Sequence, residues 1–177
     1  MKYFIIAGLL LFTNIKLMAQ ENSGPVIHDA DGFTIIKDAA YQPEKNRIYK
    51  AIYDATKMAK DSSQILPALN MAGSELNALQ VCSIPLSNAK FVVVFHGAAI
   101  NGILNNVVYR EKYGIDNPNL KTLRELKENG VQLFVCGQNL LGEKIDFKNI
   151  SPDVKVASDA LIVLMTFQNS GYALMSF

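Results

Sequence analysis

Two short apolar runs constrain the fold of this chain more than any other feature. Residues 90–95 read KFVVVF and residues 131–135 read VQLFV, and neither run alternates between apolar and polar side chains. A strand that is apolar at successive positions is buried on both faces, as in a parallel sheet covered by helices. The chain turns through a glycine soon after each run, at Gly97 and at Gly137. These runs therefore predict two central strands of a parallel sheet.

The segments around these two runs alternate between helical and extended patterns. Helices are predicted at 62–82, 100–114, 116–130 and 159–169, and further strands at 47–56, 154–157 and 172–177. Strands that alternate with helices imply a sheet with helices packed on its two faces. We expect a single α/β domain of three-layer α/β/α architecture, with a mostly parallel sheet of about five strands.

Several polar residues and glycines are expected to mark the ends of these helices. Small polar side chains stabilise helix N-termini, and a glycine often ends a helix. Pro67 falls near the first turn of the first predicted helix, and Gly130 closes the third. The expected N-caps are Ser62 or Ser63 for the first helix, Asn119 for the third and Ser158 for the last.

The first 19 residues have the pattern of a secretory signal peptide. Lys2 is followed by an apolar run, and the small residue Ala19 offers a cleavage position. A membrane anchor is the rival interpretation, but a span needs about 20 apolar residues and this run is shorter. We expect an exported, periplasmic protein with no membrane contact after cleavage. The remainder divides into an extended arm at 20–46 and an α/β domain at 47–177.

The charge balance and the cysteine count exclude several classes of protein. Removal of residues 1–19 leaves 15 basic and 16 acidic side chains. Near-neutral charge without a basic cluster argues against a nucleic-acid partner. Two cysteines are too few for a disulfide scaffold, so a hydrophobic core must stabilise the fold.

The predicted helix at 159–169 is apolar almost all the way round. Its sequence, DALIVLMTFQN, presents no polar face to solvent. In a domain of this size such a helix needs more cover than one sheet provides. Either the N-terminal arm or another subunit is expected to cover it, and we favour a homo-oligomer.

Two reactive side chains follow the two buried strands. His96 comes directly after FVVVF, and Cys136 comes directly after VQLFV. Ligands of open parallel sheets bind outside the carboxyl ends of the strands, so these residues are the candidate catalytic pair. The residues that follow them are expected to line the same pocket: Gly97, Gly137, Gln138 and Asn139.

Each candidate also has a structural interpretation. If Gly137 and Gln138 open a helical turn, its amide groups favour the thiolate of Cys136, but free cysteines are also common as small buried residues. His96 can equally bond a backbone carbonyl and fix a loop. Cys82 falls on an apolar helix stripe and is expected to be buried, and a Cys82–Cys136 disulfide remains the alternative.

No metal or cofactor is expected. The chain has no paired spacing of His, Cys or carboxylates and no CxxC sequence. The segment HGAAING, residues 96–102, lacks both the GxGxxG spacing and the Lys-Ser/Thr of a phosphate-binding loop.

Four stretches together resemble the DsrE/DsrF-like family, in its single-domain, exported branch. They are GPVI, FVVVFHGAAI, NPNLKTLRELKENGVQLFVCGQNL and ALIVLMTFQNSGYALMSF, and the resemblance covers residues 25–177. It implies a three-layer sheet assembled into a homotrimer or homohexamer. It also implies a cysteine that carries sulfur as a persulfide in sulfur relay, and Cys136 matches that cysteine. His96 matches a histidine of the same branch.

Two functions are consistent with these patterns, and a third interpretation is a structural protein in which both cysteines belong to the core. The first is a sulfur carrier or sulfurtransferase-like protein in which Cys136 accepts sulfur from a small sulfur species or thiol, with His96 as its proton-transfer partner. The second is a non-catalytic binding module whose pocket holds a small thiol or anion. A reactive thiol at Cys136 distinguishes the first from the second. The export signal and the near-neutral charge argue against a role in tRNA thiolation.

Overall fold

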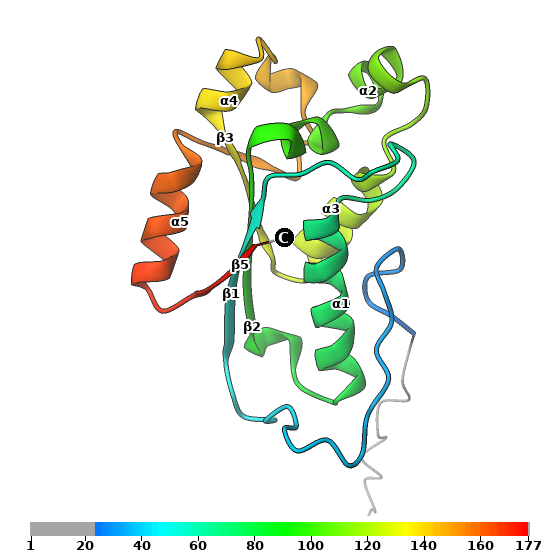
Figure 1. The fold of residues 1–177 in the computed structure, drawn as a ribbon, viewed down its shortest axis with the longest axis vertical. Helices are drawn as coiled ribbons and strands as arrows, with labels where there is room; N and C mark the ends of the chain where they lie inside the picture. Colours follow the sequence, from blue (N-terminus) through cyan, green and yellow to red (C-terminus); the bar gives the residue numbers. More distant parts are fainter. Residues whose placement is uncertain (1–23, 177) are drawn as a thin grey trace, which may run out of the picture.

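A five-stranded, all-parallel sheet forms the centre of the molecule (Figure 1). The structure is a computed structural model that describes residues 24–176, so the predicted signal peptide at 1–19 lies outside the described residues. The strand order is β4-β3-β2-β1-β5. The strands are β1 (Tyr49–Ala55), β2 (Ala89–Phe95), β3 (Gln132–Cys136), β4 (Lys155–Ala157) and β5 (Ala173–Ser176).

Helices cover both faces of this sheet unequally. Figure 1 shows α1 and α3 on one side of the strands and α5 alone on the other. The α-helices are α1 (Pro67–Val81), α2 (Asn106–Tyr113), α3 (Asn119–Glu128), α4 (Gly137–Gly142) and α5 (Ala160–Asn169), and the short 3-10 helices are η1 (Leu86–Asn88), η2 (Gly97–Ile103) and η3 (Phe147–Asn149). The expected three-layer α/β/α architecture is confirmed, and the sheet is parallel throughout.

The two buried runs form the central strands, as predicted. In β2, Val93 and Phe95 face α1 and α3, whereas Val92 and Val94 face α5, and all four are fully buried. Apolar side chains are needed on both faces of these strands, which explains why the sequence of β2 does not alternate.

The first predicted helix starts later than expected. Pro67 is the first residue of α1, and its N-cap is Leu66, so neither Ser62 nor Ser63 caps the helix. Proline disfavours helical backbone in the residue before it, and its missing N–H costs nothing in the first turn. The proline therefore sets the start of α1.

The helix predicted at 100–114 is interrupted. The chain forms η2 and then α2, with an extended Leu104 between them that bridges to Ile150. Asn105 caps α2 because its side-chain oxygen accepts a hydrogen bond from the N–H of Val108 at 3.1 Å. Asn105 therefore starts a new helix in the middle of the segment predicted as one helix.

Two other predicted caps also shift by one residue. Asp159, and not Ser158, caps α5, and it accepts hydrogen bonds from the N–H groups of Leu161 and Ile162. Asn119 is the first residue of α3 and is fully buried, where its side-chain oxygen accepts a bond from the N–H of Leu66 at 2.7 Å. Gly130, with φ of +86°, ends the α3 segment as predicted.

The described part of the N-terminal arm, residues 24–46, lies against α1 and α3. Ile27 is fully buried, and both its N–H and its carbonyl bond the side chain of Asn77 on α1. His28 and Asp29 pair with Glu125 and Lys121 of α3. The arm therefore covers the α1 and α3 side of the sheet, and the expectation that it covers the last helix is wrong.

The outer side of α5 is apolar and open to solvent in the single chain. Leu161, Ile162 and Met165 are 59%, 54% and 55% exposed. On the neighbouring edge strand, Leu174 is also exposed. Only Ala160 and Leu164 of the helix are buried against the sheet, so most of the apolar surface of α5 has no cover from the described part of the chain.

Candidate functional site

Cys136 lies where the connections between strands change sides. The loop after β3 leads into α4, whose Leu140 packs in the core shared with α1 and α3. The loop after β4 leads into α5 on the opposite face. In open parallel sheets the two diverging loops leave a crevice at such a point, and ligands bind there. Cys136 ends β3, and Asp159 follows the end of β4, so both lie where these connections diverge.

The thiol of Cys136 is buried beneath the start of α5. The residue is 3% exposed and packs with Val92, Val94, Ala160 and Leu164. Its Sγ donates a long hydrogen bond to Oδ2 of Asp159, at 3.9 Å. Because Oδ1 of the same carboxylate caps α5, the position of this helix and the surroundings of the sulfur depend on one side chain.

The turn after Cys136 requires a glycine. The predicted helical opening at Gly137 is confirmed, since α4 begins at this residue and Cys136 is its N-cap. A Cβ atom at position 137 would lie 2.8 Å from the carbonyl oxygen of Ala157. Such a contact is shorter than side chains tolerate, so the glycine allows the ends of β3 and β4 to approach each other.

His96 binds a carboxylate on the neighbouring strand. The residue follows β2, and its Nε2 lies 2.5 Å from Oδ1 of Asp54 near the end of β1. Both side chains are 21% exposed, so the pair is partly shielded from water but open to small molecules. An acidic residue that holds one ring nitrogen fixes the orientation of the imidazole and leaves the other nitrogen for proton transfer.

Strand register brings His96 and Cys136 to the same face of the sheet. Phe95 pairs with Val135 across β2 and β3, so the next residues, His96 and Cys136, are lateral neighbours. Adjacent strands are about 4.8 Å apart. The side-chain contacts of the two residues are with different carboxylates, Asp54 for the ring and Asp159 for the thiol.

The other predicted site residues connect the loops at this edge. Asn139 accepts a hydrogen bond from the N–H of Gly97 at 2.8 Å, which joins α4 to the loop after β2. Gln138 is exposed, and its Nε2 donates to the carbonyl of Ser158 at 3.4 Å. The loops after β2, β3 and β4 are therefore tied together around Cys136.

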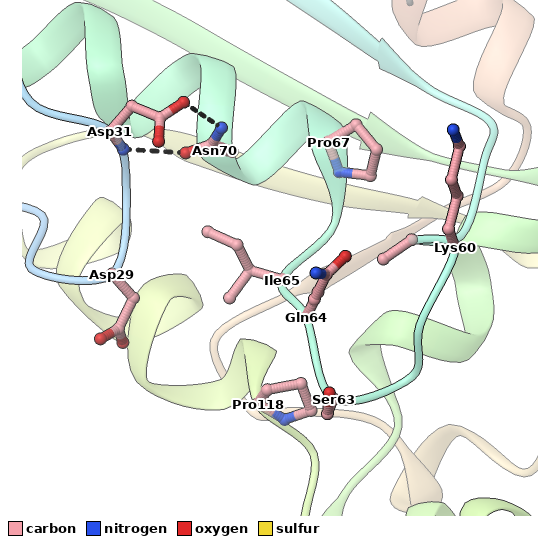
Figure 2. A pocket seen from close by; sticks show the side chains of 10 residues that line it. Asp29, Asp31, Lys60, Ser63, Gln64, Ile65, Pro67, Asn70 and Pro118 are labelled. Atoms are coloured by element: carbon pink, nitrogen blue, oxygen red, sulfur yellow. Dashed lines mark hydrogen bonds between the residues drawn. The ribbon is translucent and has the colours of Figure 1, made fainter.

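Two sizeable cavities lie away from these residues. One of 840 Å³ opens between the arm and the start of α1, where Asp31 bonds the side chain of Asn70 (Figure 2). Another of 450 Å³ lies between the arm, α1 and the β1–β5 edge. Neither is lined by Cys136, His96 or the predicted pocket residues Gly97, Gly137, Gln138 and Asn139.

The second cysteine has different surroundings. Cys82 follows the end of α1, is partly buried against the larger core and lies on the other side of the sheet from the Cys136 cluster. Both cysteines are free, so the structure contains no Cys82–Cys136 disulfide. Burial raises the pKa of the Cys82 thiol, which lowers its reactivity at neutral pH.

Asp54 and Asp159 are the site residues that the sequence analysis missed. Asp54 stands opposite the buried Tyr53 in the alternating strand 47–56, and an acid near the end of a strand is a weak signal. Asp159 lies inside the last predicted helix, for which Ser158 is the expected cap, and it is the N-cap in the structure. Within residues 24–176, no group of three or more metal-binding side chains occurs, and no helix is long and apolar enough to cross a membrane.

Comparison with known proteins agrees with this architecture. Two solved structures share the fold at a TM-score of 0.55: MTH1491, a protein of unknown function from Methanobacterium thermoautotrophicum, at 18% identity, and the ychN protein from E. coli, at 17%. Each alignment covers 73% of this chain and 99% of the other. No curated protein shows significant similarity to the chain.

The family assignment depends on the sequence itself. The model of the DsrE/DsrF-like family matches residues 33–177, which include every strand and helix described above. The resemblance to the family is therefore confirmed, and three of the four stretches that carry it lie within the matched residues. The chain belongs to the DsrE/DsrF-like family.

Proposed function

We propose that this protein is a sulfur carrier in which Cys136 bears sulfur as a persulfide. The family to which it belongs is linked to sulfur relay. The observation that carries the proposal is the position of Cys136 at the carboxyl end of β3, where the connections after β3 and β4 diverge to opposite faces of the sheet. Once α5 has moved aside, a nucleophile at that point can be reached by a donor and by an acceptor from outside the carboxyl edge of the sheet.

The proposed transfer needs no change in overall oxidation state. The Cys136 thiolate attacks the outer sulfur of a small persulfide, R–S–SH, and a new S–S bond forms as the bond to R–S⁻ breaks. The carrier then holds Cys136–S–SH, and the released thiolate takes up a proton. An acceptor thiolate later attacks the outer sulfur, and the Cys136 thiolate leaves.

His96 is the proposed proton-transfer partner in this cycle. It is the lateral neighbour of Cys136 on the same face, and its bond to Asp54 orients the ring. Histidine exchanges protons near neutral pH, which suits a step in which a thiol ionises and a thiolate is released. Asp54 is a positioning residue in this scheme, because it acts through the ring.

Access to the sulfur requires movement of α5. Cys136 is 3% exposed, and the helix begins directly over it. The first turn of α5 is held by the capping bonds of Asp159, and its outer side has no cover in the single chain. We propose that α5 shifts away from the sheet when a sulfur donor approaches.

A homo-oligomer is the proposed working form, in the periplasm. Exposed apolar side chains on α5 and β5 support it, since a second copy would remove Leu161, Ile162, Met165 and Leu174 from water. A trimer or hexamer is the expected assembly. The pattern of residues 1–19 supports export.

One observation favours the alternative function, a binding module without sulfur transfer. The Cys136 thiol is buried and donates to a carboxylate, which is how a structural cysteine is satisfied. In that case the carboxyl edge would hold a small thiol or anion, and binding would survive the replacement Cys136→Ser.

Intact mass spectrometry of the purified chain tests the proposal. The protein is incubated with a persulfide donor, and parallel samples are alkylated at several pH values. We expect the wild type and the control variant Cys82→Ala to gain one sulfur atom, and Cys136→Ala to gain none while its circular dichroism is unchanged. Unchanged loading in Cys136→Ala would remove this residue from the mechanism. Thiols that stay inert until the protein unfolds would favour the binding module.

A further inference from the structure

The 450 Å³ cavity beside the arm lies on the other face of the sheet from the Cys136 site. It is bounded by residues 49–53 of β1, by β5, by the second half of α1 and by arm residues 33–43. Cys136 ends β3 on the α5 face, whereas the β1 residues Ala51 and Tyr53 that line the cavity pack in the α1 and α3 core. This cavity is therefore a separate feature that the proposed sulfur chemistry does not use.

Aromatic rings form part of the inner and outer walls of this cavity. Tyr53 and Phe91 form part of its inner wall, with ring centroids 5.5 Å apart in an edge-to-face arrangement. On the outer side, the arm contributes Phe33 and Tyr41, which are 40% and 81% exposed. The aromatic residues of the lining are Phe33, Tyr41, Tyr49, Tyr53 and Phe91.

The charge that faces the cavity is negative. Among the lining residues only Lys50 and Glu75 carry full charges. The Lys50 ammonium bonds the carbonyl of Ser170 and lies over the Tyr172 ring, and Tyr172 packs in the α5-side cluster. The positive charge of Lys50 is thus directed to the opposite face of the sheet. Glu75 supplies the charge at the cavity.

Glu75 is exposed at the rim of the cavity, with part of its side chain shielded from water by the surrounding protein. Desolvation raises the pKa of the Glu75 carboxyl. Burial, and in second place the charge of Glu75, raises the pKa of Tyr53 on the inner wall. A positive group near both residues would therefore be stabilised by the carboxylate.

We propose that this cavity binds a small molecule with an apolar body and a single positive charge, an amine or a quaternary ammonium. Aromatic faces attract such cations, and a nearby carboxylate complements their charge. At roughly 30 Å³ for each water-sized group, 450 Å³ holds about 15 non-hydrogen atoms. The apolar body lies between α1 and the β1–β5 edge, and the cationic end lies near Glu75.

The arm forms a wall that can adjust to such a ligand. Gln42 holds the turn at 36–42 together, since its Nε2 donates to the carbonyls of Ile36, Lys37 and Ala39. Tyr49 fixes the end of the arm, where its hydroxyl accepts a bond from the N–H of Glu44 at 2.7 Å. Exposed Tyr41 lies within the turn that Gln42 holds and can cover a bound molecule.

Calorimetric titration of the purified chain with octyltrimethylammonium, below its micelle concentration, tests the proposal. The matched anion is octyl sulfate, which has the same apolar chain. We expect saturable binding of one cation per chain, at least about tenfold tighter than the anion. Equal affinities for cation and anion, or no saturable binding of the cation, would overturn the proposal.

Three variants locate the binding. Glu75→Gln is expected to weaken binding of the cation about fivefold or more and to reduce the preference over octyl sulfate. Ala173→Phe fills the cavity from the exposed edge strand and is expected to abolish binding, whereas Leu174→Phe, on the other face of the same strand, is not. Circular dichroism checks that each variant is folded.

Two results would assign the cavity differently. Binding that persists in both Glu75→Gln and Ala173→Phe would place the cation elsewhere on the chain and overturn the proposal. If the wild type binds no cation and Ala173→Phe dissociates the protein in sedimentation, the cavity is a contact between copies, and the proposal is also wrong.

Discussion

The two faces of the sheet differ in how completely they are covered. On one face, α1, α3 and the arm enclose a large core that includes Leu76, Leu123 and Phe95, all fully buried. On the other face, α5 encloses a small cluster: Ile52, Val92, Val94, Cys136, Ala160 and Leu164. The small cluster contains the candidate sulfur site, and its outer surface remains apolar.

The handedness of strand connections explains this difference. From β1 to β4 each connection moves the chain in the same direction across the sheet, and the helices α1 and α3 lie on one face. The last connection returns past β3, β2 and β1 to reach β5. Because parallel connections are right-handed, reversal of direction puts the last helix on the opposite face. One face therefore receives several elements and the other a single helix.

The largest expected effect on the free energy of unfolding separates a buried leucine on one face of the sheet from an exposed leucine on the other. Leu123→Ala in α3 is expected to lower the free energy of unfolding by about 3 kcal/mol, because it leaves a cavity in the large core. Leu161→Ala in α5 is expected to change it by about 0.5 kcal/mol or less in dilute protein. Urea unfolding measures both values.

The same pair of variants tests the role of the open face. If copies associate through α5, Leu161→Ala weakens the assembly in sedimentation, and Leu123→Ala does so only through unfolding. A large loss of stability for Leu161→Ala in dilute, monomeric protein would show that α5 is better covered than its exposure indicates.

Docking of the arm on the covered face should be sensitive to one added methyl group. A Cβ atom at Gly73 of α1 would lie 2.6 Å from Cβ of Ala30 and 2.7 Å from Cγ2 of Ile27. Gly73→Ala is therefore expected to displace the arm and to lower the free energy of unfolding by about 2 kcal/mol. Limited proteolysis within residues 24–46 reports the displacement.

Gly142→Ala is the matched control for this change. A Cβ atom there meets nothing within 4 Å, and the residue ends the short helix α4. The control should be neutral or slightly stabilising, since alanine restricts the unfolded chain. Equal losses in the two variants would mean that the contact with Ala30 and Ile27 is not the cause.

The capping carboxylate of α5 should have a smaller effect on stability. Asp159→Ala removes the acceptor for the N–H groups of Leu161 and Ile162 and is expected to cost about 1 kcal/mol. Asp159→Asn retains a capping oxygen and should cost little. Urea unfolding separates the two variants.

Asp159→Ala should also expose the sulfur. The first turn of α5 covers Cys136, so its loosening should accelerate alkylation of this thiol by iodoacetamide relative to Cys82. If alkylation of Cys136 is unchanged although stability falls, the helix start does not control access to the sulfur.

The smallest effect is expected for an exposed ion pair on the arm. Lys121 bridges Asp29 at 3.0 Å, and both side chains are open to water. Such pairs contribute little to stability, so Lys121→Ala should leave the urea midpoint unchanged within error. A shift comparable to that of Gly73→Ala would show that charge, and not packing, holds the arm.

Features with a local signal were predicted from the sequence. The central strands, the glycine after α3 and the position of Cys136 at a strand end follow from patterns within about ten residues. The predicted start of α1 is wrong. Serine is a common N-cap residue, so Ser62 and Ser63 suggested an earlier start, but the helix begins only at Pro67. The interruption at Leu104 depends on its bridge to Ile150, a residue distant in the sequence.

The partners at the candidate site had no local signal. Asp54 meets His96 only because β1 lies beside β2, and Asp159 meets Cys136 only because β4 lies beside β3. The strand order and the register decide these contacts, and neither can be read from one segment. The side of the sheet on which the arm lies is likewise determined by its tertiary contacts with Asn77 and Glu125.

The position of β5 has a consequence for folding. Because β5 follows the other strands in the chain and pairs with β1, β1 remains an open edge until the segment from Ala160 to Ser176 has docked. Until then Ile52, Val92 and Val94 have no helix over them. Unpaired edges and apolar faces of this kind bind chaperones or other chains. Slow docking of this last segment would therefore favour aggregation of partly folded chains.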